Sequence, residues 1–165
     1  MKINTITCSK TRAINDSYVF YRDLNNSRIQ FGGRTLEILD ANAGLAAAKF
    51  RPQRDFVTAG YDHVHFLTPL TQSDLVTCVS YVTGAKGKVI EVFTKIIAND
   101  TFKDEQKIAF TSFCSLVVKA DEVSFKKLIP ESSEEKYLTS TFAKRQENRQ
   151  NDLAYNKELV KHLTK

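Results

Sequence analysis

The segment that decides the fold is residues 34–50, RTLEILDANAGLAAAKF. Its apolar residues recur at the spacing of one helix face; they are Leu36, Leu39, Ala43, Ala46 and Ala47. Alanine favours a helix, and Arg51-Pro52 ends it, because the residue before a proline avoids the helical conformation. The segment carries few charges, so we expect a helix that is buried on most sides.

Five segments rich in β-branched and aromatic residues predict strands around this helix. They are residues 14–22, 56–67 (interrupted at Gly60), 75–83, 88–98 and 107–119. The connections are short, and Gly84-Ala85-Lys86-Gly87 predicts a hairpin turn, so neighbouring strands should be antiparallel. Together these elements predict an α+β fold, in which an antiparallel sheet of five to six strands curls around one central helix.

The composition changes after about residue 120. We expect a linker at residues 126–130, and then a capping box of Ser132 and Glu135 that begins a charged helix over residues 133–163. The sparse apolar stripe of this helix should pack on the domain or on a neighbouring subunit. The chain therefore divides into a domain at 1–125 and a linker with a helical extension at 126–165.

Composition and charge argue against several classes of protein. The chain has 165 residues, 42% of them hydrophobic, which suits one globular domain. Its net charge of +5 comes from basic residues interleaved with acidic ones, so nucleic acid is not an expected partner. Neither a signal peptide nor a membrane span of roughly 20 apolar residues is evident, so we expect no membrane contact and a cytoplasmic location. The three cysteines, Cys8, Cys78 and Cys114, are widely spaced and should be free thiols in a reducing compartment.

Asp40 is the unusual residue of the predicted central helix. It lies among apolar neighbours in sequence, where an ionised carboxylate must be hydrogen-bonded or reach a cleft, because burying an unpaired charge is costly. Two explanations are open. Asp40 is either a structural residue, at the solvent edge of the helix or paired with Arg54 or Lys49, or a functional one.

Residues 25–40 read NNSRIQFGGRTLEILD, in which an asparagine precedes Phe-Gly-Gly and an aspartate follows the second glycine by seven residues. This order resembles the signature of the hot-dog acyl-CoA thioesterases, in the branch of cytosolic acyl-CoA hydrolases. The resemblance continues in the right order through shorter matches at residues 56–60, 64–70, 74–76, 91–92, 129–131 and 143–149. It implies the hot-dog fold, with the sheet wrapped around the central helix and a C-terminal helical extension.

The resemblance also implies an activity, the hydrolysis of acyl-CoA to a free fatty acid and CoA. Asp40 would act as general base on a water, or as nucleophile through a mixed anhydride. Asn25 of the partner subunit would orient the water or the carbonyl, and the Thr58 hydroxyl would support Asp40 or the water. Backbone N–H groups at Gly32 and Gly33 would stabilise the oxyanion, because the first N–H groups of a helix lack intrahelical partners.

The family forms its active site between subunits, so the resemblance implies a homodimer as the smallest active unit, and further a trimer of dimers. The phosphates of CoA would bind a basic rim. The candidates are Lys86, Gly87 and Lys88 on the hairpin, followed by Arg145 and Arg149. CoA enters as part of the substrate and leaves as product, so no separate cofactor and no metal are expected.

Three positions depart from the family pattern. The family usually has glycine where this chain has Arg28, and often where it has Ser73. Its cofactor-binding hairpin commonly has serine where this chain has Val89. The change at Arg28 affects a turn. With Val89 in place of the serine, the pattern does not determine which residues contact CoA.

Three alternative functions stay open from the sequence. A hot-dog dehydratase needs a histidine that works with an acid, a role for His63 or His65; the same pair lacks further ligands at metal spacing. A non-catalytic acyl-CoA sensor would keep the acyl pocket but lose the Asn–Asp pair, which this chain retains. A nucleic-acid binder would rest on charge alone. Acyl chain length is not determined by these patterns.

Overall fold

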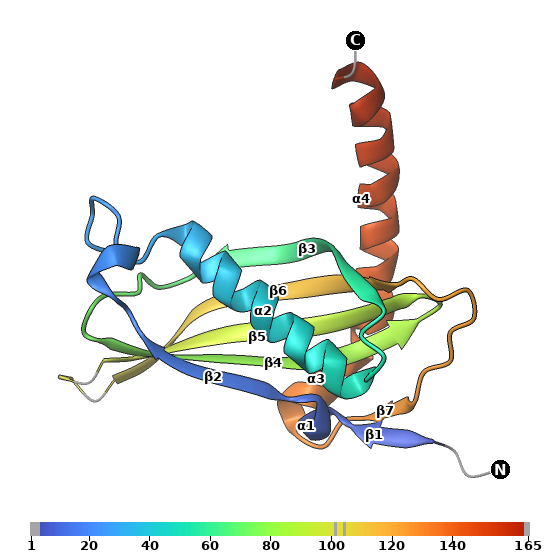
Figure 1. Cartoon of the computed structure of the whole chain (residues 1–165), viewed down its shortest axis with the longest axis horizontal. Helices are drawn as coiled ribbons and strands as arrows, with labels where there is room; N and C mark the ends of the chain where they lie inside the picture. The colour runs from blue at the N-terminus through green and yellow to red at the C-terminus, as the bar shows by residue number, and fades with distance from the viewer. Residues whose placement is uncertain (1–3, 101, 104, 164–165) are drawn as a thin grey trace.

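The structure is a computed structural model that describes residues 4–100, 102–103 and 105–163. Its elements, in chain order, are β1 (Thr5–Thr7), α1 (Cys8–Thr11), β2 (Ala13–Tyr18), the 3-10 helix η1 (Tyr21–Asp23), α2 (Gly32–Phe50), β3 (Phe56–Phe66), β4 (Asp74–Lys86), β5 (Val89–Asp100), β6 (Glu105–Val118), β7 (Lys127–Ile129), α3 (Ser133–Ser140) and α4 (Phe142–Leu163). Figure 1 shows α2 lying across one face of the main sheet, with α4 projecting away from the body of the fold.

The main sheet has five strands in the described part of the chain, in the order β2-β4-β5-β6-β3, and every neighbouring pair is antiparallel. This arrangement confirms the predicted antiparallel sheet around one helix. β4 and β5 form the predicted hairpin, whose turn contains Gly87 at φ +61°, a conformation that favours glycine. β3 is an edge strand, so one row of its backbone groups lacks a strand partner among the described residues.

α2 packs on the sheet through one face only. The residues of this face are fully buried; they are Leu39, Ala43, Ala46 and Ala47. They belong to core clusters with residues of β4, β5 and β6, and the small alanine side chains let the helix lie close to the strands. The opposite face is open, with Leu36 40% and Leu45 57% exposed. The helix is therefore not buried on most sides as expected, because no element of the described chain covers its outer face.

The other face of the sheet is covered at one end by α3 and the first turns of α4. Leu138 of α3 belongs to a third core cluster on that face. Phe142 at the start of α4 lies against Gly84, where a Cβ atom would come within 2.4 Å of its ring. The Arg145 guanidinium pairs with the buried Glu91 carboxylate at 2.7 Å. These contacts fix the base of α4 on the sheet.

The C-terminal segment differs from the prediction in two places. Residues 127–129, expected to be part of a linker, form β7, which pairs in parallel with β1. The single helix expected over 133–163 is two helices, α3 and α4, which meet at Thr141. The Thr141 hydroxyl donates to the carbonyls of Tyr137 and Leu138, and such a side chain competes with the backbone N–H groups that would continue the helix.

α3 begins with the predicted capping box. The Ser132 hydroxyl accepts from the Glu135 N–H, and the Glu135 carboxylate accepts from the Ser132 N–H. The prediction of this helix start is therefore confirmed. None of the helices in the described residues is long and apolar enough to cross a membrane.

Candidate active site

Asp40 lies on α2 and is hydrogen-bonded to two residues of β3. It is exposed, and its Oδ1 atom accepts two hydrogen bonds, from Thr58 Oγ1 at 3.0 Å and from the Tyr61 hydroxyl at 2.6 Å. Asp40 forms no ion pair with any described residue, and the Lys49 ammonium instead donates to the Arg12 carbonyl. A structural ion pair with Lys49 or Arg54 is therefore not the reason why a carboxylate lies at this position of α2.

A β-bulge brings both hydroxyl donors to the same side of β3. Residues three apart on a regular strand point to opposite faces of a sheet. The register between β3 and β6 shifts between Thr58 and Gly60, which adds one residue, so that Thr58 and Tyr61 both reach α2. The sequence analysis did not single out Tyr61. The signal that was available is Gly60 inside the strand, since an isolated glycine in a strand often marks a bulge.

The start of α2 offers free N–H groups. α2 begins at Gly32 after Phe31, which makes no side-chain cap, and the first hydrogen bond runs from the Arg34 N–H to the Phe31 carbonyl at 2.9 Å. The N–H groups of Gly32 and Gly33 precede that bond and are available to an acceptor. A Cβ atom on Gly33 would lie 2.5 Å from the Phe31 ring, so glycine allows the close packing here.

Asn25 organises the loop before α2. Its Oδ1 atom accepts from the N–H groups of Ser27 at 2.9 Å and Ile29 at 3.3 Å, which leaves its NH₂ group as the donor. Arg28 in this loop has φ +58°, the left-handed conformation that glycine adopts without strain. This backbone explains physically why a glycine would suit the position of Arg28.

Asn25 and Asp40 do not meet within one chain. None of the hydrogen bonds of Asn25 reaches Asp40. Asp40 follows Gly33 by seven residues, which is about 10 Å along the helix axis. One chain therefore presents two separate halves of a site, with the carboxylate on the middle of α2 and the amide and N–H donors at its start.

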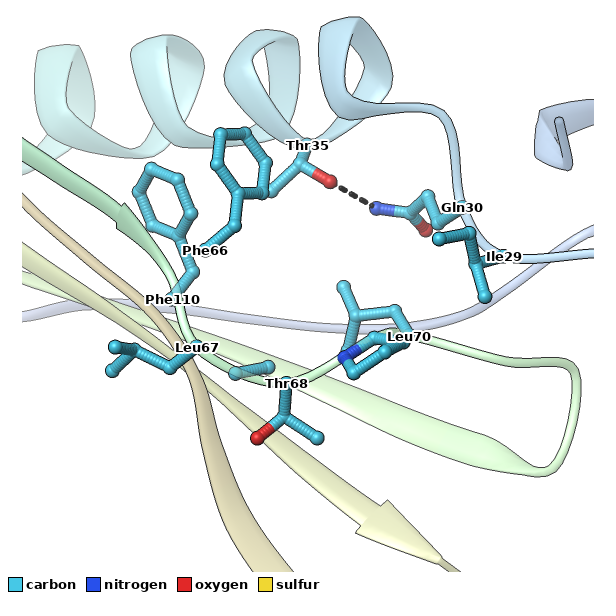
Figure 2. Close-up of a pocket in the computed structure, with 10 residues that line it drawn as sticks. Ile29, Gln30, Thr35, Phe66, Leu67, Thr68, Leu70 and Phe110 are labelled. Atoms are coloured by element: carbon cyan, nitrogen blue, oxygen red, sulfur yellow. Dashed lines mark hydrogen bonds between the residues drawn. The ribbon is translucent and has the colours of Figure 1, made fainter. Parts of the chain in front are cut away.

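A cavity lies beside the start of α2 (Figure 2). It has a volume of about 170 Å³ and is lined mainly by apolar side chains, among them Ile29, Phe66 and Leu70. Its polar edge is a hydrogen bond from Gln30 Nε2 to Thr35 Oγ1, at 2.9 Å. The Phe66 ring lies 3.5 Å from the position of a Cβ on Gly32, so the cavity adjoins the free N–H groups.

The chain shares this architecture with acyl-CoA hydrolases. Residues 29–101 match the Thioesterase superfamily. The uncharacterised acyl-CoA thioester hydrolase YkhA of Bacillus subtilis is 33% identical over 159 residues, which are 94% of this chain and 92% of YkhA. The chain belongs to the hot-dog acyl-CoA thioesterase family.

Solved structures of this family confirm the hot-dog fold. An acyl-CoA hydrolase from Bacillus cereus superposes with a TM-score of 0.90 at 33% identity, over 96% of this chain and 98% of that one. An acyl-CoA hydrolase from Staphylococcus aureus, in complex with butyryl-CoA, CoA and CoA disulfide, gives 0.87 at 27% identity over 98% and 99%.

The predicted CoA-binding residues of this thioesterase fall into two groups. Lys86, Gly87 and Lys88 are exposed at the β4–β5 turn, at the end of the sheet near the C-terminus of α2 (Figure 1), and neither lysine is ion-paired with a described residue. Arg145 and Arg149 are largely buried and lie in intramolecular ion pairs, with Glu91 and with Asp62, each at 2.7 Å. The two arginines thus anchor α4 to the sheet.

Neither His63 nor His65 is hydrogen-bonded to the Asp40 carboxylate, whose donors in the described part of the chain are Thr58 and Tyr61. His63 packs edge-on against Phe113, with ring centroids 6.0 Å apart, and Phe113 borders the core cluster on the sheet face opposite α2. Asp40 lies on the α2 side, so His63 does not work with it. The His65 ring lies 6.4 Å from that of His63, and neither ring is paired with Asp40 in the described residues. The dehydratase alternative therefore has no acid–histidine pair at Asp40. In the described part of the chain, no group of three or more His, Cys, Asp or Glu residues is arranged to hold a metal ion.

Proposed function

We propose that the protein hydrolyses acyl-CoA to a free fatty acid and CoA at a site shared by two subunits. Asp40 of one subunit supplies the carboxylate, and Asn25 with the N–H groups of Gly32 and Gly33 of the other supplies the donors. The observation that carries this proposal is the Asp40 carboxylate. It is exposed, it is held by two hydroxyl groups on one oxygen, and its other oxygen accepts no hydrogen bond from any described residue.

The open face of α2 and the open edge of β3 leave room for a second subunit. Phe31 is 61% exposed, and with Leu36 and Leu45 it leaves large apolar side chains uncovered along α2. A second copy related by a twofold axis would place two α2 helices side by side in opposite directions. Gly33 of one helix would then approach Asp40 of the other and assemble two equal sites. An apo structure of an acyl-CoA thioesterase 28% identical to this chain is hexameric, which supports an oligomer.

The two halves of the site supply the base and the hydrogen-bond donors that thioester hydrolysis needs. The free Oδ2 atom of Asp40 takes a proton from a water, whose oxygen attacks the thioester carbonyl. The amide of Asn25 and the N–H groups of Gly32 and Gly33 donate to the developing oxyanion. Collapse of the tetrahedral intermediate breaks the C–S bond, and the CoA thiolate leaves with the proton that Asp40 had taken from the water, which restores the carboxylate. In the nucleophilic alternative, Asp40 itself attacks and water then hydrolyses the mixed anhydride.

The cavity and the hairpin suit the two ends of the substrate. The cavity next to Gly32 is apolar and would hold the start of the acyl chain, while Lys86 and Lys88 would face the phosphates of CoA. Structures of Staphylococcus aureus hydrolase variants replace an asparagine, an aspartate and a threonine by alanine. That asparagine and aspartate are separated by the same number of residues as Asn25 and Asp40, which supports their assignment here.

The test is thiol release from acetyl-, butyryl-, octanoyl- and palmitoyl-CoA by wild type and Asp40→Asn. Loss of the base should lower the rate by at least ~100-fold. Glu158→Gln is the matched control, because Glu158 is an exposed acid on α4, which projects away from α2, and it pairs with Lys161. If Asp40→Asn keeps full activity, the assignment of the carboxylate fails. If the wild type binds acyl-CoA without releasing thiol, the protein is a sensor.

A further inference from the structure

Tyr61 makes the shorter of the two hydrogen bonds to Asp40, at 2.6 Å. Its ring packs against both core clusters under α2, so the hydroxyl has a fixed position. Burial raises the pKa of Tyr61, and the hydrogen bond to Asp40 raises it further. The hydroxyl therefore stays protonated and acts as a donor to the carboxylate.

The Tyr61 hydroxyl also contacts the thiol of Cys114, which lies opposite it on β6. Cys114 is 1% exposed, and burial raises the pKa of its thiol to about 12. Cys114 and the Tyr61 ring belong to the same packed cluster under α2, so the core side of Tyr61 is fully covered. The Tyr61 hydroxyl donates to Asp40 from this fixed base.

We propose that Tyr61 is a positioning residue of the thioesterase site, whose hydroxyl fixes Oδ1 of Asp40 so that Oδ2 alone faces the reacting water. Rotation of the carboxylate would exchange its two oxygens, and donors from Tyr61 and Thr58 on one oxygen resist that rotation. The inference rests on the function proposed above, since it concerns how the base is aimed.

The test is Tyr61→Phe in the complete enzyme, assayed for thiol release with the acyl-CoA that the wild type hydrolyses fastest. We expect kcat to fall by about tenfold to a hundredfold, which is what the loss of one hydrogen bond to a charged group corresponds to. KM should change little, because Tyr61 does not touch the substrate.

Tyr81→Phe is the matched control. The Tyr81 hydroxyl also donates to a carboxylate, that of Glu134 at 2.8 Å, but it lies on the face of the sheet opposite Asp40. A role of Tyr61 in stability alone would make the two variants alike in thermal unfolding and in kcat. That result overturns the proposal, whereas active Asp40→Asn would instead overturn the proposed function.

A second variant tests the same role of the hydroxyl in case the Tyr61→Phe protein does not fold. Incorporation of 3-fluorotyrosine at position 61 keeps the shape of the ring and makes the hydroxyl a stronger donor. Its kcat should stay close to that of the wild type, unlike that of Tyr61→Phe, because the donor to Asp40 is kept. A kcat as low as that of Tyr61→Phe contradicts the role of the Tyr61 hydroxyl.

Discussion

At the scale of single residues, Arg28 occupies a backbone conformation that costs free energy. Its φ of +58° lies in the left-handed region, which costs an L-residue about 1–2 kcal/mol, whereas glycine adopts it freely but loses more entropy on folding. We expect Arg28→Gly to be more stable than the wild type by about 0.5–1 kcal/mol in urea unfolding. Arg28→Ala is the control, because it removes the same side chain and keeps the strain. Equal stability of the two variants would contradict this account.

At the scale of elements, the start of α3 is held to the N-terminal segment by Glu135. Burial opposes ionisation of Glu135, but hydrogen bonds from the Ser132 and Glu131 N–H groups and the ion pair with Arg12 outweigh it, so its pKa lies below the ordinary 4.5. A carboxylate with a lowered pKa in the folded state stabilises the fold above its unfolded pKa. That stabilisation is lost as the pH falls through the folded value.

This linkage predicts a pH-dependent difference between wild type and Glu135→Gln. The free energy of unfolding of the wild type should exceed that of Glu135→Gln at pH 7, and the gap should narrow as the pH falls below 4.5. Urea unfolding at a series of pH values measures this gap. Glu158→Gln is again the control, because that exposed acid on α4 should leave the curve close to the wild type. A gap that does not change with pH would refute the role of Glu135.

The elements that the sequence predicts correctly are those governed by local pattern. The helical spacing around Leu39 predicts α2, the strand segments predict the sheet, and Ser132 with Glu135 predicts the start of α3. What local pattern misses depends on distant partners. The β3 bulge that turns Tyr61 toward Asp40 needs β6 beside it, and β7 exists because β1 pairs with it. Arg145 also depends on a distant partner. Its positive charge suggests a contact with phosphate, but local pattern does not show that it pairs with the buried Glu91.

At the scale of the whole molecule, the proposed site requires two chains. Asn25→Ala and Asp40→Asn should each be inactive as homo-oligomers. In a mixed dimer one site carries both substitutions and the other carries none. Equal amounts of the two variants, refolded together, should therefore recover about a quarter of the wild-type rate of thiol release. Each variant refolded alone is the control, and a mixture that stays inactive would place Asn25 and Asp40 in the same subunit's site.

The burial of all three cysteines has a consequence for the reaction that the protein is proposed to perform. Cys8, Cys78 and Cys114 are buried free thiols, and burial raises their pKa values to about 11, 12 and 12. Thiolates carry out disulfide exchange, so side chains that stay protonated and covered react slowly. An enzyme that releases a thiol at every turnover is thereby protected from forming a mixed disulfide with its own product.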